Sequence, residues 1–132
     1  MKMDIEFIKI PEIINSKGTI GVIEKDTVPF EVKRVYYLFD VPSSSKRGGH
    51  AHKNLKQLLI ALSGSFDVVL NDGEKVETIT LNKPNVGLLI NNTIWREIEN
   101  FSSGSVCLVL ASDVFNEDDY IRNFDEFLAF VK

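Results

Sequence analysis

The chain has 132 residues, of which 26% are charged and 44% are hydrophobic. Its 19 acidic side chains outnumber its 15 basic ones, so the balance is unlike that of a nucleic-acid-binding protein, and an anionic partner needs a local basic cluster. The length predicts one domain, residues 1–132, with a real hydrophobic core.

The N-terminal residues MKMDIEFIKI mix charged and apolar side chains. No segment approaches about 18 uninterrupted apolar residues, so neither a signal peptide nor contact with a membrane is predicted. The single cysteine, Cys107, lies in the apolar run VCLVLA, which suits a buried strand residue and a reducing compartment. We therefore expect a cytoplasmic protein.

Most of the chain consists of short runs rich in Val, Ile, Leu, Phe and Tyr, separated by turn residues, which is the pattern of an all-β protein. Asp72-Gly73 in LNDGEK predicts a hairpin. LKQLLIALSG contains helix-favouring residues, but its place between strands and its Ser63-Gly64 end favour a strand. In chain order, the predicted strands are IEFIKI, GTIGVIE, FEVKRVYYLFD, HKNLKQLLIALSGS, FDVVL, VETITL, VGLLI, TIWREIENF and VCLVLAS.

Only the C-terminal segment NEDDYIRNFDEFLAFVK has a helical pattern. Acidic residues stand in its expected first turn, and Ile121, Phe124, Phe127 and Leu128 recur at helical spacing. The run NEDD is then the solvated start of this helix. The many short strands predict a jelly-roll sandwich or small barrel with a short C-terminal helix.

Both histidines of the chain, His50 and His52, lie in RGGHAHKNLKQLLIALSGSF. In an extended strand alternate side chains share a face, so the two imidazoles point the same way. A His-x-His pair in a β protein is half of a metal site and needs further ligands.

The surroundings of this pair resemble the cupin motifs, in which a glutamate follows the pair and a third histidine comes much later. Gln57 and Arg96 stand at those two ligand positions. Glutamine is a neutral and weaker ligand, and a charged arginine cannot ligate. The pattern therefore disfavours a metal and favours an anionic or carbonyl substrate, with a histidine that moves protons. Two half-exposed strand histidines without a function are the plain alternative.

Further polar residues could share this pocket. Arg34 and Tyr36 alternate in KRVYY and so lie on one face of a strand. Tyr36 could pass a proton beside His50, although a tyrosine here is also a common core residue. Lys46 and Arg47, in the glycine-flanked loop SSSKRGG, could hold a diphosphate because guanidinium groups match phosphate oxygens.

Taken together, the segments KRVYY, RGGHAHKNLKQLLIALSGS, GLLI with IWREI, and VLASDVFNEDDYIRNFDEF resemble the nucleotide-sugar 3,4-ketoisomerases. The resemblance covers nearly the whole chain, from about Ile5 to Phe127. It implies a cupin-like jelly roll and an enzyme that uses neither a metal nor a cofactor. That enzyme moves the keto group of dTDP-4-keto-6-deoxyglucose from carbon 4 to carbon 3 through an enediol.

The same resemblance implies roles for residues and a place in metabolism. His50 is the catalytic base and Tyr36 its helper in proton exchange, while His52 and Gln57 orient the sugar or the base. The product feeds an aminotransferase that makes 3-amino sugars for surface polysaccharide such as the O-antigen of lipopolysaccharide. Members of this family form homodimers with exchanged N-terminal strands.

The cations follow from the resemblance as well. Arg47 and Arg34 meet the diphosphate or the sugar, and Arg96 favours the enediolate. Arg96 follows the motif tryptophan as in the gluco-producing (quinovose) type. Lys17, otherwise an ordinary surface lysine, stands where that type has tyrosine and the galacto (fucose) type has arginine. We favour the gluco product.

Two departures from the family pattern affect loops. The segment 114–116 lacks the paired tyrosines that often follow Ser-Asp, and INNTIW lacks the usual proline. Two other functions stay open at this point: a non-catalytic module that binds nucleotide sugars, and a metal-dependent cupin enzyme.

Overall fold

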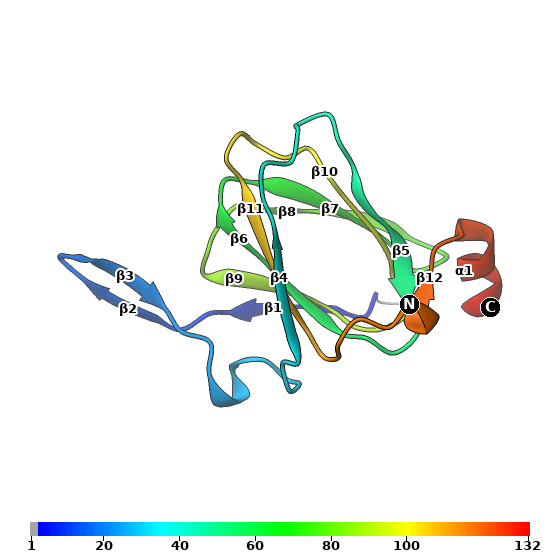
Figure 1. Ribbon diagram of the computed structural model, residues 1–132, viewed down its shortest axis with the longest axis horizontal. Coiled ribbons are helices and arrows are strands. Elements are labelled where there is room, and N and C mark those ends of the chain that lie inside the picture. Colours follow the sequence, from blue (N-terminus) through cyan, green and yellow to red (C-terminus); the bar gives the residue numbers. More distant parts are fainter. Residues whose placement is uncertain (1–2) are drawn as a thin grey trace.

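The computed structural model describes residues 3–132 as two five-stranded antiparallel sheets and a separate hairpin (Figure 1). The first sheet has the order β1 (Ile5–Lys9), β9 (Val86–Ile90), β6 (Gln57–Ser63), β11 (Val106–Ala111) and β4 (Arg34–Leu38). The second has the order β12 (Tyr120–Ile121), β5 (Arg47–His52), β10 (Trp95–Glu99), β7 (Phe66–Asn71) and β8 (Val76–Leu81). The hairpin consists of β2 (Glu12–Asn15) and β3 (Gly18–Gly21) and projects away from the barrel.

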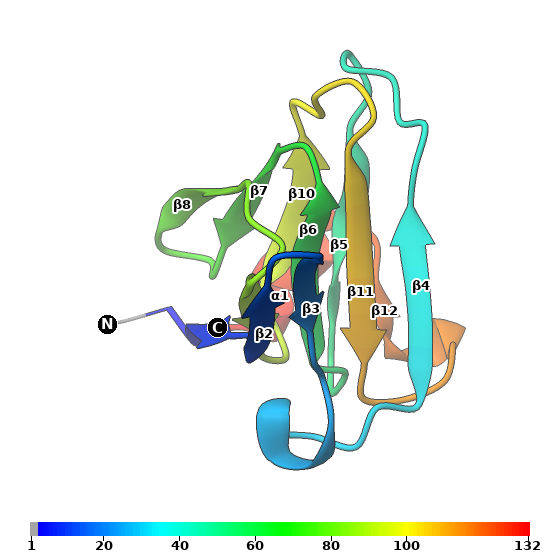
Figure 2. The same cartoon turned by 90° about the vertical axis from the view of Figure 1, so that its left-hand side faces the viewer.

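The jelly-roll barrel expected from the sequence is confirmed. The segment with helix-favouring residues is strand β6, which lies between β9 and β11, and Figure 2 shows β6, β11 and β4 side by side. The LNDGEK segment forms the predicted hairpin between β7 and β8. Its turn is closed by Asp72, whose Oδ1 accepts hydrogen bonds from the backbone N–H groups of Glu74 and Lys75, each at 2.8 Å.

The C-terminal helix is shorter than predicted. The acidic residues form a separate 3₁₀ turn, η2 (Glu117–Asp119), and the α-helix α1 covers only Phe124–Phe130. The intervening β12 pairs with the edge of β5, and this strand pairing replaces helix formation at residues 120–121. A second 3₁₀ turn, η1 (Lys25–Thr27), follows the hairpin. No helix within residues 3–132 is long and apolar enough to span a membrane.

The main core lies between the two sheets and is apolar. Inward-facing residues of both sheets pack there, among them Leu59, Val68, Leu70, Ile98 and Val109. A smaller cluster lies outside the second sheet, where α1 covers Ala51 and Trp95. Cys107 is fully buried, as expected from its apolar run. The exceptions inside the barrel are polar: Gln57 and Arg96 are each 2% exposed, and they mark the end of the barrel where the site lies.

A close approach of β5 to β10 sets the geometry at this end. His50 pairs with Arg96 and Gly48 with Glu97, so a bulge separates the two pairs. Gly48 has a φ of +87°, and a Cβ added there would lie 2.9 Å from the carbonyl oxygen of Arg96. Only glycine combines this backbone angle with so small a gap. Gly48 therefore allows His50 to stand opposite Arg96.

This role of Gly48 can be tested against its neighbour. Gly49 also has a positive φ, +73°, but nothing lies within 4 Å of its added Cβ. Both Gly→Ala variants carry the backbone strain, and only Gly48→Ala also meets the backbone of β10. We expect Gly48→Ala to lower the free energy of unfolding by about 1–3 kcal/mol more than Gly49→Ala. Urea denaturation measures the difference, and equal losses would contradict the close approach.

Candidate active site

A cavity of about 560 Å³ opens at the polar end of the barrel. Its walls come from both sheets, because β4 and β6 supply one side and β5 and β10 the other. Six of the eight site residues predicted from the sequence line it, namely Arg34, Tyr36, Arg47, His50, Gln57 and Arg96. The structure thus brings together residues that are far apart in the chain, since Arg34 and Arg96 are separated by 62 positions.

The cavity is strongly basic although the chain as a whole is acidic. Five cationic side chains line it, namely Arg34, Lys46, Arg47, Arg96 and Arg122. No carboxylate of the described residues lines it. This is the local basic cluster that an anionic partner requires in a chain of net charge −4.

His50 is a neutral imidazole on the wall of this cavity. Burial and, after it, the positive charge of Arg96 lower the pKa of His50 to about 4. A neutral imidazole has a free lone pair at physiological pH, so His50 can accept a proton. Its position opposite Arg96 adds to the effect of burial on the pKa and places a cation next to the proton acceptor.

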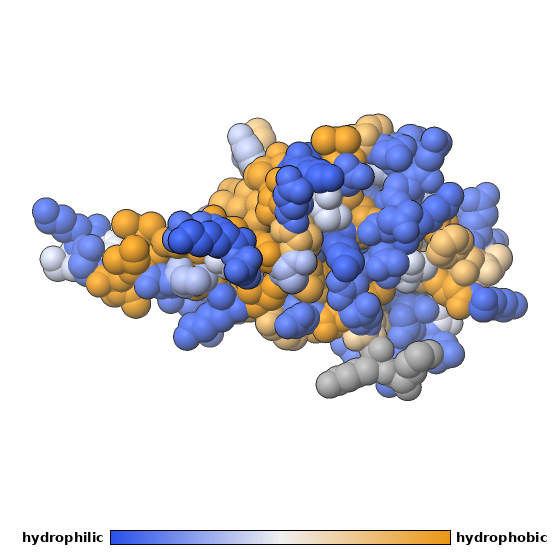
Figure 3. Space-filling view, turned by 90° about the horizontal axis from the view of Figure 1, so that it is seen from below, coloured by the Kyte–Doolittle hydropathy of each residue, from blue (hydrophilic) through white to orange (hydrophobic). Residues whose placement is uncertain are grey.

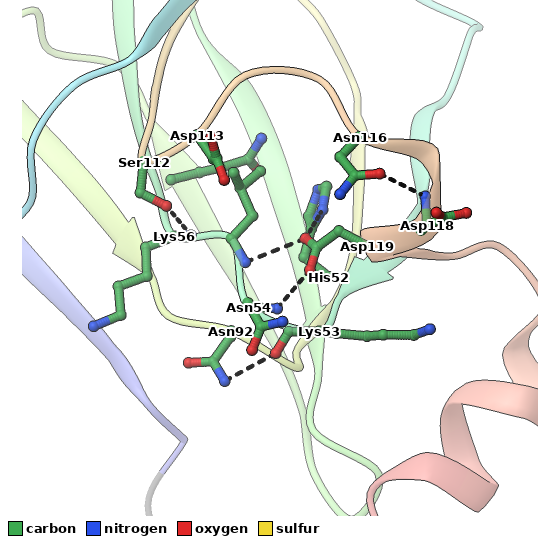
Figure 4. A network of polar contacts seen from close by, with 12 residues as sticks. His52, Lys53, Asn54, Lys56, Asn92, Ser112, Asp113, Asn116, Asp118 and Asp119 are labelled. Atoms are coloured by element: carbon green, nitrogen blue, oxygen red, sulfur yellow. Dashed lines mark hydrogen bonds and ion pairs between the residues drawn. The ribbon is translucent and has the colours of Figure 1, made fainter.

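His52 lies behind His50 and does not line the main cavity. It is fully buried, and burial lowers its pKa to about 2. Its Nδ1 lies 3.2 Å from Oδ2 of Asp119 (Figure 4), and a neutral imidazole can meet a carboxylate only by donating N–H. The rings of His52 and His50 are 4.8 Å apart and edge-on. The sequence predicts that His52 orients the sugar or the base, and its place behind His50, outside the main cavity, favours the second of these roles.

The carboxylate of Asp119 accepts hydrogen bonds from the backbone as well as from His52. Its Oδ1 accepts a hydrogen bond from the backbone N–H of Asn54 at 2.8 Å, and its Oδ2 from that of Leu55 at 3.2 Å (Figure 4). The backbone N–H of Lys53 donates to the Asp119 carbonyl at 2.9 Å. These contacts lock the turn after β5 to η2 and fix the ring of His52.

Tyr36, Gln57 and Arg96 form a chain of hydrogen bonds at the inner end of the cavity. Nη1 of Arg96 donates to Oε1 of Gln57 at 2.6 Å, and Nε2 of Gln57 donates to Oη of Tyr36 at 3.0 Å. Nε of Arg96 donates to the carbonyl oxygen of Ile94 at 3.0 Å. Burial lowers the pKa of Arg96 to about 10 and raises the pKa of Tyr36. At neutral pH the guanidinium is charged and the phenol keeps its proton.

This arrangement does not fit a metal ion. The single side-chain oxygen of Gln57 already accepts from Arg96, and the guanidinium repels a second cation in the space beside His50. Within residues 3–132, no three His, Cys, Asp or Glu side chains gather in a way that could hold a metal.

Four functional candidates were missed by the sequence reasoning: Phe115, Asp119, Tyr120 and Arg122. The ring of Tyr120 lies 5.0 Å from that of His50 and 5.5 Å from that of Phe115, at the edge of the cavity. The available signal was the motif DDYIR, which contributed to the family resemblance. The sequence pattern predicts a helix for this motif, whereas residues 117–119 form a 3₁₀ turn and Tyr120–Ile121 pair with β5.

The altered loop at 114–116 contributes to the cavity. Phe115 lines it, and the guanidinium carbon of Arg34 lies 5.9 Å from the Phe115 ring and 4.7 Å from the Tyr36 ring. A phenyl ring thus supplies an aromatic surface in this loop.

Lys17 lies outside the cavity of its own subunit. It occupies the exposed turn of the β2–β3 hairpin, the part of the molecule that projects farthest from the barrel (Figure 1). Because the hairpin points away from the barrel of its own chain, the substrate contact predicted for Lys17 requires a second copy of the chain and stays a prediction.

Comparison with known proteins identifies close relatives. Residues 3–132 match the family described as "FdtA: WxcM-like, C-terminal". The chain is 45% identical over 130 residues to the TDP-4-oxo-6-deoxy-alpha-D-glucose-3,4-oxoisomerase of Aneurinibacillus thermoaerophilus, which covers 98% of this chain and 94% of that protein.

Among solved structures, one relative is a histidine-to-asparagine variant of the 3,4-ketoisomerase of Thermoanaerobacterium thermosaccharolyticum in complex with TDP-4-keto-6-deoxyglucose. It has 41% identity and a TM-score of 0.97 over 99% of this chain and 96% of that one. The TDP-quinovose 3,4-ketoisomerase of Campylobacter jejuni has 49% identity and a TM-score of 0.91 over 96% and 98%.

Two further solved structures are less similar in sequence, and they differ from the relatives above in product type or in reaction. The TDP-fucose-3,4-ketoisomerase of Campylobacter jejuni has 34% identity and a TM-score of 0.93 over 98% of this chain and 97% of that one. The dTDP-4-dehydrorhamnose 3,5-epimerase of Bacillus anthracis has 13% identity and a TM-score of 0.76 over 89% and 77%, which shows a shared cupin-like fold alone.

The protonation state of the two histidines gives a direct test of the site. Because both pKa values are lowered, we expect both imidazole signals in proton NMR to stay near their neutral positions from pH 8 down to pH ~5. His50→Asn removes one signal and so assigns the pair. A midpoint above ~6 for His50 in this titration would contradict the lowered pKa.

The same lowered pKa values predict a loss of stability in acid. Unfolding returns both groups to a pKa of 6.5, so the unfolded chain binds more protons and stability falls as the pH drops below 6.5.

Proposed function

The chain belongs to the dTDP-sugar 3,4-ketoisomerase family, and from that premise we propose how its side chains carry out the reaction. As a member it is a 3,4-ketoisomerase of TDP-4-keto-6-deoxyglucose. The observation that carries the mechanism is the meeting of neutral His50, protonated Tyr36 and charged Arg96 in one basic cavity.

The reaction begins at carbon 3 of the sugar, whose proton is acidified by the neighbouring carbonyl at carbon 4. His50 takes this proton, the electron pair of the C–H bond forms a double bond between carbons 3 and 4, and the carbonyl oxygen becomes an enediolate oxygen. The charge of Arg96, whose side chain is buried, stabilises that oxygen. Tyr36 then donates its phenolic proton to carbon 4 and is reprotonated by the imidazolium of His50, while the proton of the carbon 3 hydroxyl moves to the oxygen on carbon 4. The keto group now stands at carbon 3.

The outer cations bind the rest of the substrate. Arg47 is the first residue of β5 and lines the cavity together with Lys46 and Arg34. A guanidinium presents its N–H groups in a plane that matches the oxygens of a diphosphate. We assign the diphosphate to this group, which leaves the sugar ring between His50 and Tyr36.

We favour the gluco configuration at carbon 4 of the product. Arg96 agrees with the quinovose type, and the identity to the quinovose-type relative exceeds that to the fucose-type relative, 49% against 34%. Lys17 is the one feature that resembles the fucose type. The reaction then supplies 3-amino sugars for surface polysaccharide, in the cytoplasm as expected from the sequence.

The active assembly is proposed to be a homodimer with exchanged N-terminal strands. The β2–β3 hairpin exposes Ile13, Ile14 and Ile20, which are 55%, 72% and 56% exposed, and Figure 3 shows hydrophobic residues along this projecting arm. These side chains stay exposed among residues 3–132, and packing against a second copy of the chain would bury them. In that dimer Lys17 would reach the partner's cavity.

Incubation with TDP-4-keto-6-deoxyglucose in deuterated water tests the reaction. NMR of carbons 3 and 4 should show the 3-keto sugar with deuterium at carbon 4 in gluco configuration. His50→Asn should lower kcat by at least ~10²-fold, since it removes the base, while calorimetry shows unchanged TDP binding. Binding of the substrate by the wild type without exchange at carbon 3 would instead identify a binding module.

The dimer is tested with two matched surface variants. Val76 is 62% exposed and lies on β8, at the edge of the second five-stranded sheet and not in the hairpin. We expect Ile14→Asp to shift the mass in sedimentation equilibrium from about twice the 14.9 kDa of the chain towards a single copy, and Val76→Asp to leave it at two. A wild-type monomer at micromolar concentration would contradict the exchange of strands.

A further inference from the structure

We infer that Gln57 acts as a positioning residue that fixes the direction of the hydrogen bond at Tyr36, so that the phenolic proton points at the substrate. This inference rests on the proposed function, which makes Tyr36 part of the catalytic pair. It gives Gln57 a role other than contact with the sugar and follows from the donors and acceptors along one buried chain.

The first step is the orientation of the Gln57 amide. A guanidinium has N–H donors and no acceptor. Nη1 of Arg96 lies 2.6 Å from Gln57, so the atom it meets must be the amide oxygen. The guanidinium cannot turn away freely, because its Nε is also bound to the carbonyl oxygen of Ile94. A buried cation therefore decides which end of the Gln57 amide faces β10.

The second step is the proton of Tyr36. With its oxygen towards Arg96, Gln57 directs its NH₂ group to Tyr36, and an amide nitrogen only donates. The phenolic oxygen must then accept this bond at 3.0 Å, and its single proton lies elsewhere. Arg34 packs over the ring of Tyr36 and also offers donors only. No hydrogen bond in residues 3–132 takes the phenolic proton, and Tyr36 is one of the residues that line the cavity.

The third step is the consequence for the chemistry. His50 faces the cavity as an acceptor and Tyr36 faces it as a donor, so a base and an acid of fixed direction share one site. A glutamate at position 57 would reverse this arrangement. Its carboxylate would pair with Arg96 through one oxygen and accept the phenolic proton with the other, which turns Tyr36 away from the substrate.

Gln57→Glu is therefore the informative variant, since it keeps the size of the side chain and its bond to Arg96. We expect kcat to fall by about 10²-fold, to the level of Tyr36→Phe, with KM changed less than ~3-fold. The double variant Tyr36→Phe/Gln57→Glu should be no slower than Tyr36→Phe alone, because both changes remove the same donor. Wild-type kcat in Gln57→Glu, multiplied losses in the double variant, or a rise in KM alone would overturn the inference.

A second measurement depends neither on the folding of Gln57→Glu nor on turnover. The Raman doublet of a tyrosine differs between a phenol that accepts a strong hydrogen bond and one that donates it. The difference spectrum between wild type and Tyr36→Phe isolates Tyr36 from the other two tyrosines. We expect the spectrum of an acceptor in the free enzyme, and the spectrum of a strong donor would overturn the inference. An inactive wild type with an acceptor spectrum would refute the proposed function and leave the orientation of Gln57 intact.

Discussion

The site depends on one buried charge, the guanidinium of Arg96. Burying it is costly unless its donors are satisfied. The carbonyl of Ile94 and the amide of Gln57 accept from Nε and Nη1, while Nη2 has no hydrogen-bond partner within residues 3–132. The same charge helps to keep His50 neutral and directs the chain of hydrogen bonds that ends at Tyr36. The guanidinium of Arg96 thus helps to keep His50 unprotonated, and through Gln57 it orients the phenolic proton of Tyr36.

The fold serves this charge by bringing two sheets together at a polar end. Gly48 allows β5 to approach β10 so closely that His50 faces Arg96, while β4 and β6 bring Tyr36 and Gln57 from the opposite sheet. Behind His50, the bond between His52 and Asp119 ties the end of β5 to the chain after β11. The catalytic side chains therefore lie on strands, and a loop closes the cavity around them.

Much of this could be predicted from the sequence, and the failures have a physical cause. Alternation placed Arg34 with Tyr36, and the substitution of metal ligands by Gln57 and Arg96 predicted a cationic site, because both inferences rest on local rules. Asp119 and Tyr120 were missed because acidic residues before an amphipathic segment also start helices. What decides there is pairing with the edge of β5, a contact between residues far apart in the chain. The substrate contact predicted for Lys17 depends on a second copy of the chain for a related reason, since no local pattern reports where a hairpin points.

The most direct measurement of the central claim is the pH dependence of kcat/KM for loss of the carbon 3 deuteron from labelled TDP-4-keto-6-deoxyglucose. This parameter reports the free enzyme, in which burial and Arg96 hold the pKa of His50 at about 4. The account predicts a rate that stays level from pH 8 to pH ~5.5. A rate that falls with a midpoint near 6.5, the ordinary value for histidine, would show that burial and the neighbouring cation do not hold the pKa of the base down.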